Sequence, residues 1–543
     1  MNLKEKPFYL TQEEVNWVNN TLKKLTLEEK IHQMFCVLGD AYSKEDLEAL
    51  AKSGIGGVLF RPVRNILETK KCYERLDELS PLPLLHAANL EEGGAGISSD
   101  GTYFASQLGV AASDNISDVI NFAKVCAYEG IQAGVDWTFS PVSDLDINFL
   151  NPITNCRTFG SDVNRVRTFT SKFVEVYQSY GLAACAKHFP GDGVDFRDQH
   201  LHPTYNSLSS KDWFMSYGSI YSSMIDKGLL SVMVGHICEP NIEKEYNPNI
   251  AFKDILPASL SKTMLTKVLR ERLNFNGLIC TDASIMGGYT MPLAREIAIP
   301  TSFASGIDLI VFSTDIKEDF KYALEGIKKG ILTLERVDEC VSRVLALKAY
   351  LSRDKKVEKI DGDLVSKECA NHAITLVKNN ANYLPLNTKK YSRVRLVILG
   401  NDDGPNGSIK ELAKNAFISK GFDVEIYDPF KDDLHGTSHL DKKRITVTFL
   451  HYPPASNQTT VRVAWCKKHA LEIPRFVNEE DYIFVSLANP YHLIDVPRAK
   501  VFINAYTGTK NAIEAVINKL CGESSFEGVN PVDPFCNMED TKL

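Results

Sequence analysis

The chain has 543 residues, of which 44% are hydrophobic and 24% are charged, and its formal net charge is −8. This composition is ordinary for a globular protein, and the length exceeds what a single hydrophobic core organises, so two or three domains are expected. The acidic balance and the lack of a long Lys/Arg run argue against nucleic acid or a membrane surface as a partner.

The N-terminal segment lacks the apolar core of a signal peptide, and no run of about 18 apolar residues occurs, so a cytoplasmic location without membrane spans is expected. The 12 cysteines are scattered singly, without a CxxC pair, which argues against structural zinc. Cys185 and Cys280 lie inside apolar runs, as small core residues do. Reduced thiols fit a cytoplasmic protein.

From residue 10 to about residue 350, short apolar runs alternate with segments whose apolar residues recur at helical spacing. The predicted strands are residues 55–60, 84–88, 137–140, 182–186, 231–234, 278–280 and 308–312, and helices such as 116–133 and 163–180 lie between them. Strands that are apolar throughout and alternate with helices are typical of a parallel sheet buried on both faces. They predict a (β/α)8 TIM-like barrel over residues 1–350, with an open doubly wound sheet as the alternative.

The charged stretch at residues 351–365 is predicted to be a linker, and residues 366–543 a second domain. A helical pattern over residues 364–377 opens this part of the chain. Strand-like runs follow at residues 394–399, 424–427, 445–450, 482–487 and 501–505, with helices such as 410–420 and 510–520 between them. This alternation predicts a smaller α/β sandwich domain, so the whole chain falls in the α/β class.

Polar residues follow directly after several predicted barrel strands. They are Asn89, Asp144, Lys187, His188, His236 and Asp282. In a barrel the carboxyl ends of all the strands meet on one face, and catalysis takes place there. Residues far apart in the sequence are therefore expected to converge on one pocket, which favours an enzyme.

The densest polar segment, residues 187–203, holds three histidines and three aspartates. Its proline and glycines exclude regular structure, so it is predicted to be a loop over the barrel face. Asp198 and His200 are spaced so that the carboxylate can accept a hydrogen bond from one imidazole nitrogen, which leaves the other free to carry a proton. A solvated loop with a local Asp–His bond is the structural alternative. A metal site built from His188, His200, His202 and the aspartates is a third.

Asp282 ends a predicted buried strand at the barrel mouth, although a carboxylate there also suits the N-cap of a following helix. A nucleophilic carboxylate opposite a proton donor is what glycoside hydrolysis requires. Arg157, in NPITNCRTFG, has a guanidinium that suits bidentate binding of hydroxyls or a carboxylate, but a structural salt bridge is the common role of a lone arginine.

Taken together, these segments resemble glycoside hydrolase family 3, and within it the bacterial β-N-acetylglucosaminidase branch. The resemblance rests on five motifs in the right order across nearly the whole chain. They are LTLEEKIHQM (25–34), NPITNCRTFG (151–160), KHFPGDG (187–193) followed by Asp198-Gln-His200, NGLICTDASIM (276–286) and AITLVKNNANYLPL (373–386).

The resemblance implies a retaining exo-glycosidase that removes terminal β-linked N-acetylglucosamine from chitin oligomers or cell-wall fragments. Asp282 would be the nucleophile, and His200 with Asp198 the acid/base dyad. The residues implied to bind the sugar are Asn89, Arg157, Lys187, His188, Met233 and His236. Neither a metal nor a cofactor is implied, and homodimer formation is left open.

The chain departs from the family pattern at three positions, with Asn89 in place of Asp, Asp192 in place of His and Gln199 in place of Ser. Asn89 keeps hydrogen-bonding capacity but loses a charge, so the departures bear on fine specificity. The alternative function is a β-N-acetylglucosaminide phosphorylase. Because no phosphate-binding motif is evident, hydrolysis is expected to dominate, with phosphate giving a minor share of sugar 1-phosphate.

Overall fold

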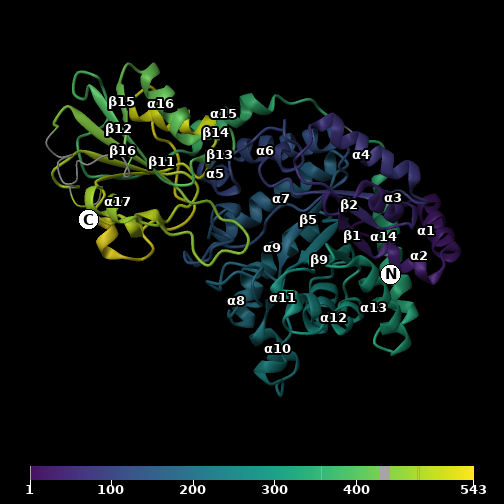
Figure 1. Ribbon diagram of the computed structural model, residues 1–543. Coiled ribbons are helices and arrows are strands. Elements are labelled where there is room, and N and C mark those ends of the chain that lie inside the picture. Colours follow the sequence, from purple (N-terminus) through teal and green to yellow (C-terminus); the bar gives the residue numbers. More distant parts are fainter. Residues whose placement is uncertain (1, 356, 429–440, 474, 476) are drawn as a thin grey trace. The chain divides into compact units, whose positions relative to one another are not determined.

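The computed structural model describes residues 2–355, 357–428, 441–473, 475 and 477–543, which form two compact units (Figure 1). The barrel unit comprises Met1–Thr102, Ala123–Asn148 and Val163–Ile360, and the second unit comprises Tyr103–Phe122, Phe149–Asp162 and Asp361–Leu543. Within the described ranges, no helix is long and apolar enough to cross a membrane.

The barrel unit holds a closed barrel of parallel strands, in the order β1-β10-β9-β7-β5-β4-β3-β2. This confirms the predicted TIM-like barrel and excludes the open sheet. The strands are β1 (Phe35–Leu38), β2 (Gly57–Leu59), β3 (Leu85–Ala88), β4 (Trp137–Thr138), β5 (Ala183–Phe189), β7 (Ser231–Val234), β9 (Leu278–Ala283) and β10 (Leu309–Val311). Strand β1 is not among the predicted strands. A single residue, Met34, separates it from the preceding helix, and no turn residues mark its start.

Helices surround the barrel, and several begin with side chains that satisfy their free backbone N–H groups. Thr11, Thr26 and Asn65 each form a capping box with the glutamate three residues on. The helices are α1 (Gln12–Lys24), α2 (Leu27–Gln33), α3 (Lys44–Lys52), α4 (Ile66–Leu79), α6 (Ile116–Gln132), α7 (Val163–Ser179), α8 (Ser210–Met215), α9 (Tyr217–Asp226), α10 (Pro240–Tyr246), α11 (Gly287–Thr290), α12 (Arg295–Ser305), α13 (Ile316–Lys328) and α14 (Leu334–Leu351), with a π-helix at Thr263–Arg272.

The second unit is built on a six-stranded sheet in the order β11-β18-β17-β16-β12-β15, as the predicted α/β sandwich requires. Its strands are β11 (Thr375–Asn379), β12 (Arg393–Gly400), β15 (Asp423–Ile426), β16 (Arg444–His451), β17 (Tyr482–Ser486) and β18 (Val501–Asn504), and its helices include α5 (Gln107–Ala112), α15 (Gly362–Ala373), α16 (Ile409–Ser419), α17 (Lys467–Glu472) and α18 (Lys510–Leu520). The helix predicted over residues 364–377 ends at Ala373. The next residues form β11, which pairs antiparallel with β18.

The two units do not follow the predicted domain boundaries in full. The main division, after Ile360, falls inside the predicted linker, of which residue 356 lies outside the described residues. Residues 103–122 and 149–162, which the sequence analysis assigned to the barrel, cluster with the second unit. The reason is shared burial, because Leu108, Ala112 and Cys156 pack in one apolar cluster with Tyr491 and Tyr506.

A buried carboxyl group lies next to the long polar loop. Strand β8 (Ile237–Cys238) pairs with β6 (Thr204–Tyr205), and Glu239 follows directly. Glu239 is fully buried, and neither carboxyl oxygen has a hydrogen-bond partner among the described residues. Burial, and then the nearby Glu243, raise the pKa of Glu239 well above its ordinary value.

We expect Glu239→Gln to stabilise the protein at pH 8, by about 1–3 kcal/mol. The unfolded carboxyl ionises above pH 4.5 whereas the folded one resists ionisation, so wild-type stability falls as the pH rises from there. Urea unfolding at pH 5 and pH 8 measures the difference. Glu245→Gln is the control and should leave the pH dependence unchanged, because Glu245 lies on the helix that follows Glu239 but in an exposed pair with Arg272. Parallel pH dependence in wild type and Glu239→Gln would contradict this account.

Candidate active site

The carboxyl ends of β3 and β5 bring a charged pair together. Asn89 follows β3 and is exposed, whereas Lys187, on β5, is 3% exposed. The Lys187 ammonium donates to Asn89 Oδ1 at 3.2 Å and forms a salt bridge with Glu91. This arrangement holds the Asn89 carbonyl oxygen in place and leaves the donors of its amide nitrogen available to a ligand.

His188 is fixed between two carboxylates. The Asp144 carboxylate accepts from the His188 backbone N–H at 3.1 Å and bonds Nδ1 of the ring at 2.7 Å. The other ring nitrogen, Nε2, lies 3.8 Å from Asp282 Oδ2. Because Asp144 orients the ring, His188 on β5 presents its second ring nitrogen to Asp282 on β9.

Asp282 lies within β9 and does not cap a helix. The helix that follows, α11, begins at Gly287, and Asp282 Oδ1 accepts a hydrogen bond from the Ala283 backbone N–H at 2.7 Å. Burial acts to raise the pKa of Asp282, but the imidazole of His188, followed by those of His236 and His200, holds it below its ordinary value. Asp282 is therefore ionised at neutral pH.

The predicted Asp198–His200 hydrogen bond is present. Asp198 Oδ1 accepts from the His200 backbone N–H at 2.8 Å and bonds Nδ1 of the ring at 2.7 Å. The Asp198 side chain is fully buried, whereas that of His200 is 26% exposed. Among the described residues, no hydrogen bond is made to His200 Nε2, so this nitrogen can exchange a proton with a bound molecule.

His236 is a buried neutral residue at the end of β7. Its ring bonds Ser259 Oγ at 2.9 Å and Ala283 O at 3.1 Å. Burial lowers the pKa of His236 to about 4, so it is neutral at neutral pH and His188 is the main electrostatic partner of Asp282. His236 thereby fixes the backbone next to Asp282.

Two further predicted residues have different surroundings. Met233 is 3% exposed within β7, so it offers almost no surface to a ligand. Arg157 lies in a 3-10 turn, Asn155–Arg157, which clusters with the second unit. For both, contact with the terminal sugar stays a prediction.

The side chains that position the others were predicted only in part, because Asp144 was expected in the pocket without its role, and Glu91 and Ser259 were not expected there. Glu91 pairs with Lys187 and Asp144 orients His188, and in each case the partner comes from another strand. Glu91 has a weak signal in the sequence, because it lies two residues after Asn89. Ser259, which bonds His236, has none. Among the described residues, no group of three or more His, Cys, Asp or Glu side chains is placed to hold a metal ion.

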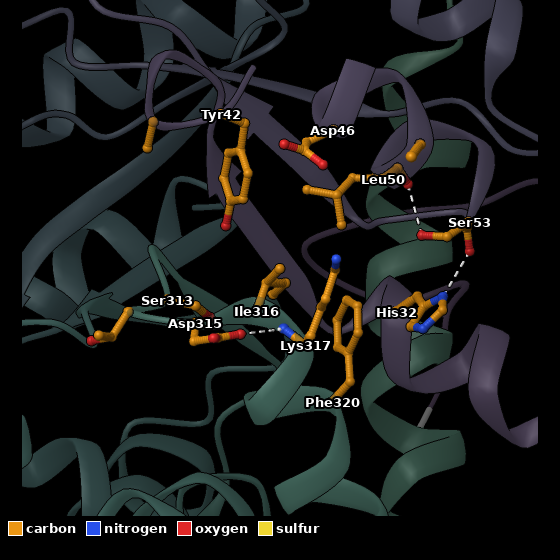
Figure 2. Close-up of a pocket in the computed structure, with 13 residues that line it drawn as sticks. His32, Tyr42, Asp46, Leu50, Ser53, Ser313, Asp315, Ile316, Lys317 and Phe320 are labelled. Atoms are coloured by element: carbon orange, nitrogen blue, oxygen red, sulfur yellow. Dashed lines mark hydrogen bonds between the residues drawn. The ribbon is translucent and has the colours of Figure 1, made fainter. Parts of the chain in front are cut away.

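A cavity of about 560 Å³ lies outside this cluster, between α3 and the start of α13 (Figure 2). Leu50, Ile316 and the contacting, mutually tilted rings of His32 and Phe320 supply its apolar surface. Asp315 caps α13 by accepting from its first backbone N–H groups, so the helix end is closed to an anion. None of the predicted site residues lines this cavity.

The cluster at the barrel mouth is arranged for acid/base and nucleophilic chemistry. Asp282 is ionised there, and His200 is one of the imidazoles that lower its pKa, after His188 and His236. A buried carboxylate holds the imidazole through Nδ1 and leaves Nε2 open. An ionised carboxylate near an imidazole with an open ring nitrogen can supply a nucleophile and a proton donor.

Comparisons with known proteins identify the family of the chain. Residues 26–347 match the model of the glycosyl hydrolase family 3 N-terminal domain. The chain is 36% identical to a β-N-acetylglucosaminidase/β-glucosidase of Cellulomonas fimi, over 100% of both chains. It is 28% identical to a β-hexosaminidase of Vibrio cholerae, over 51% of this chain and 80% of the relative. The solved structure of β-glucoside phosphorylase BglX superposes with a TM-score of 0.92 and 39% identity, over 99% of each chain. The chain therefore belongs to glycoside hydrolase family 3.

Proposed function

We propose that the chain cleaves terminal β-linked glucosyl and N-acetylglucosaminyl residues by double displacement, with Asp282 as nucleophile and His200 as acid/base. This proposal rests on two different groups at the barrel mouth, a carboxylate that is ionised and an imidazole that can carry a proton. Asp282 is kept ionised, and His200 is kept with one ring nitrogen open. An ionised carboxylate can attack the sugar, and an imidazole with an open nitrogen can pass a proton to or from it.

In the first step, an Asp282 carboxylate oxygen attacks the anomeric carbon. The bond from that carbon to the leaving-group oxygen breaks, and protonated His200 gives its Nε2 proton to that oxygen. The products are a glycosyl ester on Asp282 and a free alcohol. Asp198 stabilises the protonated imidazole and fixes the ring orientation.

In the second step, an acceptor oxygen attacks the anomeric carbon and Asp282 leaves as a carboxylate. If the acceptor is water, neutral His200 takes its proton. Two inversions give overall retention, so the first product has the β configuration. The double name of the C. fimi relative supports a site that takes both glucose and N-acetylglucosamine.

A second candidate is phosphorolysis, in which phosphate replaces water as the acceptor. The match to a β-glucoside phosphorylase over 99% of both chains supports it. So does the acid/base group, since neutral or protonated His200 does not repel an anion. A carboxylate at about 4 Å would oppose phosphate by about 4 kcal/mol at an effective dielectric of roughly 20. From the sequence alone, water was expected to be the main acceptor. These observations favour phosphate over water, and we propose phosphate as the preferred acceptor.

We expect 4-nitrophenyl β-N-acetylglucosaminide and β-glucoside to give mainly the sugar 1-phosphate in 10 mM phosphate, and the free β-sugar in a phosphate-free buffer. Early NMR spectra of the anomeric proton and of phosphorus identify both products. Free sugar as the main product at every phosphate concentration would leave the double displacement intact and exclude the phosphorylase. An α-anomer as the first product would contradict the double displacement itself.

A further inference from the structure

The part of the site around His200 carries exposed apolar side chains that the proposed sugar binding does not use. Leu201 follows His200 directly and is 36% exposed. Ile285 lies three residues after Asp282 and is 54% exposed, whereas its neighbour Met286 is buried. We call Leu201 and Ile285 the apolar rim.

Backbone hydrogen bonds hold the two segments of the rim side by side. The Gly287 N–H donates to His200 O at 2.8 Å, and the Gly288 N–H donates to Gln199 O at 3.1 Å. The approach is close, because a Cβ on Gly287 would lie 2.2 Å from Leu201 O. Only glycine fits there, so the turn after β9 and the loop carrying His200 lie in direct backbone contact.

The polar and apolar residues of the site come from different strands. The sugar-binding candidates Asn89, Lys187 and His188 follow or end β3 and β5, with the carboxylates of Glu91 and Asp144 beside them. The rim comes from the loop that carries the acid/base group and from the turn after the nucleophile. A proton donor must lie next to the leaving-group oxygen, so the residues that flank His200 border the leaving group and not the sugar ring.

We propose that the apolar rim, Leu201 and Ile285, forms part of the leaving-group subsite and selects glycosides whose leaving group is an alkyl or aryl alcohol. Aliphatic side chains that remain exposed in the free protein gain by covering a hydrocarbon. This inference rests on the proposed function, because it takes His200 as the acid that protonates the leaving group. It replaces sugar oligomers with apolar glycosides as the favoured substrate class.

The test compares kcat/KM for methyl and octyl β-D-glucoside, two primary alkyl glycosides, with phosphate present. We expect wild type to favour octyl glucoside about tenfold or more, and the Leu201→Ser/Ile285→Ser double variant to favour it about twofold or less. Each single variant should lose part of the preference, so the result does not depend on the double variant folding. Met215→Ser is the matched control, since Met215 is 65% exposed on α8 and its replacement should leave the tenfold preference in place.

Two results would overturn the inference: equal kcat/KM for both glucosides in wild type, or an octyl preference that survives the double substitution. Failure of the proposed function would look different. In that case wild type would release no sugar or sugar 1-phosphate from either glucoside or from the nitrophenyl substrates.

Discussion

Asp282→Ala is expected to abolish turnover, with a loss on the order of 10⁴–10⁶ in kcat for both glucosides and N-acetylglucosaminides. The variant keeps the imidazole but has no oxygen that can form the glycosyl ester. Added azide should restore measurable turnover and give an α-glycosyl azide, because a small anion can take the place of the missing carboxylate and attack once. Steady-state rates and product NMR measure both effects.

The control for this substitution is a carboxylate on the same barrel unit that lies outside the proposed site. Asp315 caps α13 beside the cavity of Figure 2. Asp315→Ala should cost about 1 kcal/mol of stability and leave turnover near wild type. Turnover lost in Asp315→Ala and kept in Asp282→Ala would move the active site to the cavity between α3 and α13.

His200→Ala is expected to harm substrates in proportion to the basicity of their leaving groups. For methyl and octyl glucoside, the loss in kcat/KM should be about 10²–10⁴, because the departing alkoxide needs a proton. For 2,4-dinitrophenyl glucoside it should be about tenfold or less, because that phenolate leaves without protonation. Asp198→Ala should give a milder version of the same pattern, since Asp198 acts only through the His200 ring.

His202→Ala is the matched control, because it removes an imidazole from the same loop. The His202 ring bonds only the carbonyl of Pro203 among the described residues, at 3.2 Å. Its removal should change all three substrates by a similar small factor. If His200→Ala also damaged the three substrates equally, His200 would be a structural residue and the proton donor would lie elsewhere.

The barrel could be predicted because most of its strands are short apolar runs between turn residues, such as Ser231–Val234, which matches the prediction residue for residue. Some elements could not be predicted, because contacts with residues distant in the sequence determine their structure. The predicted helix extends to residue 377, yet residues 375–379 pair as strand β11 with β18. Residues 103–122 pack into the second unit because their apolar side chains find a core there.

In the candidate site, too, local contacts could be predicted from the sequence and long-range contacts could not. The Asp198–His200 bond follows from a spacing of two residues and was predictable from the sequence. The Asp144–His188 and Glu91–Lys187 pairs join residues more than forty positions apart, and only the closed barrel brings them together. The pKa of Asp282 is lowered mainly by the His188 imidazole on β5, which is far from Asp282 in the sequence, so local sequence does not encode it.

The central claim, a covalent glycosyl ester on Asp282, is tested most directly by trapping that ester. A 2-deoxy-2-fluoro-β-glucoside with an acidic leaving group should form the ester and release it slowly, because fluorine destabilises the positive charge of the second transition state. Mass spectrometry of a protease digest should then show one added 2-fluoroglucosyl group, on the peptide that contains NGLICTDASIM and at Asp282 within it. A label on any other carboxylate, or turnover of the reagent without a labelled peptide, would contradict the account.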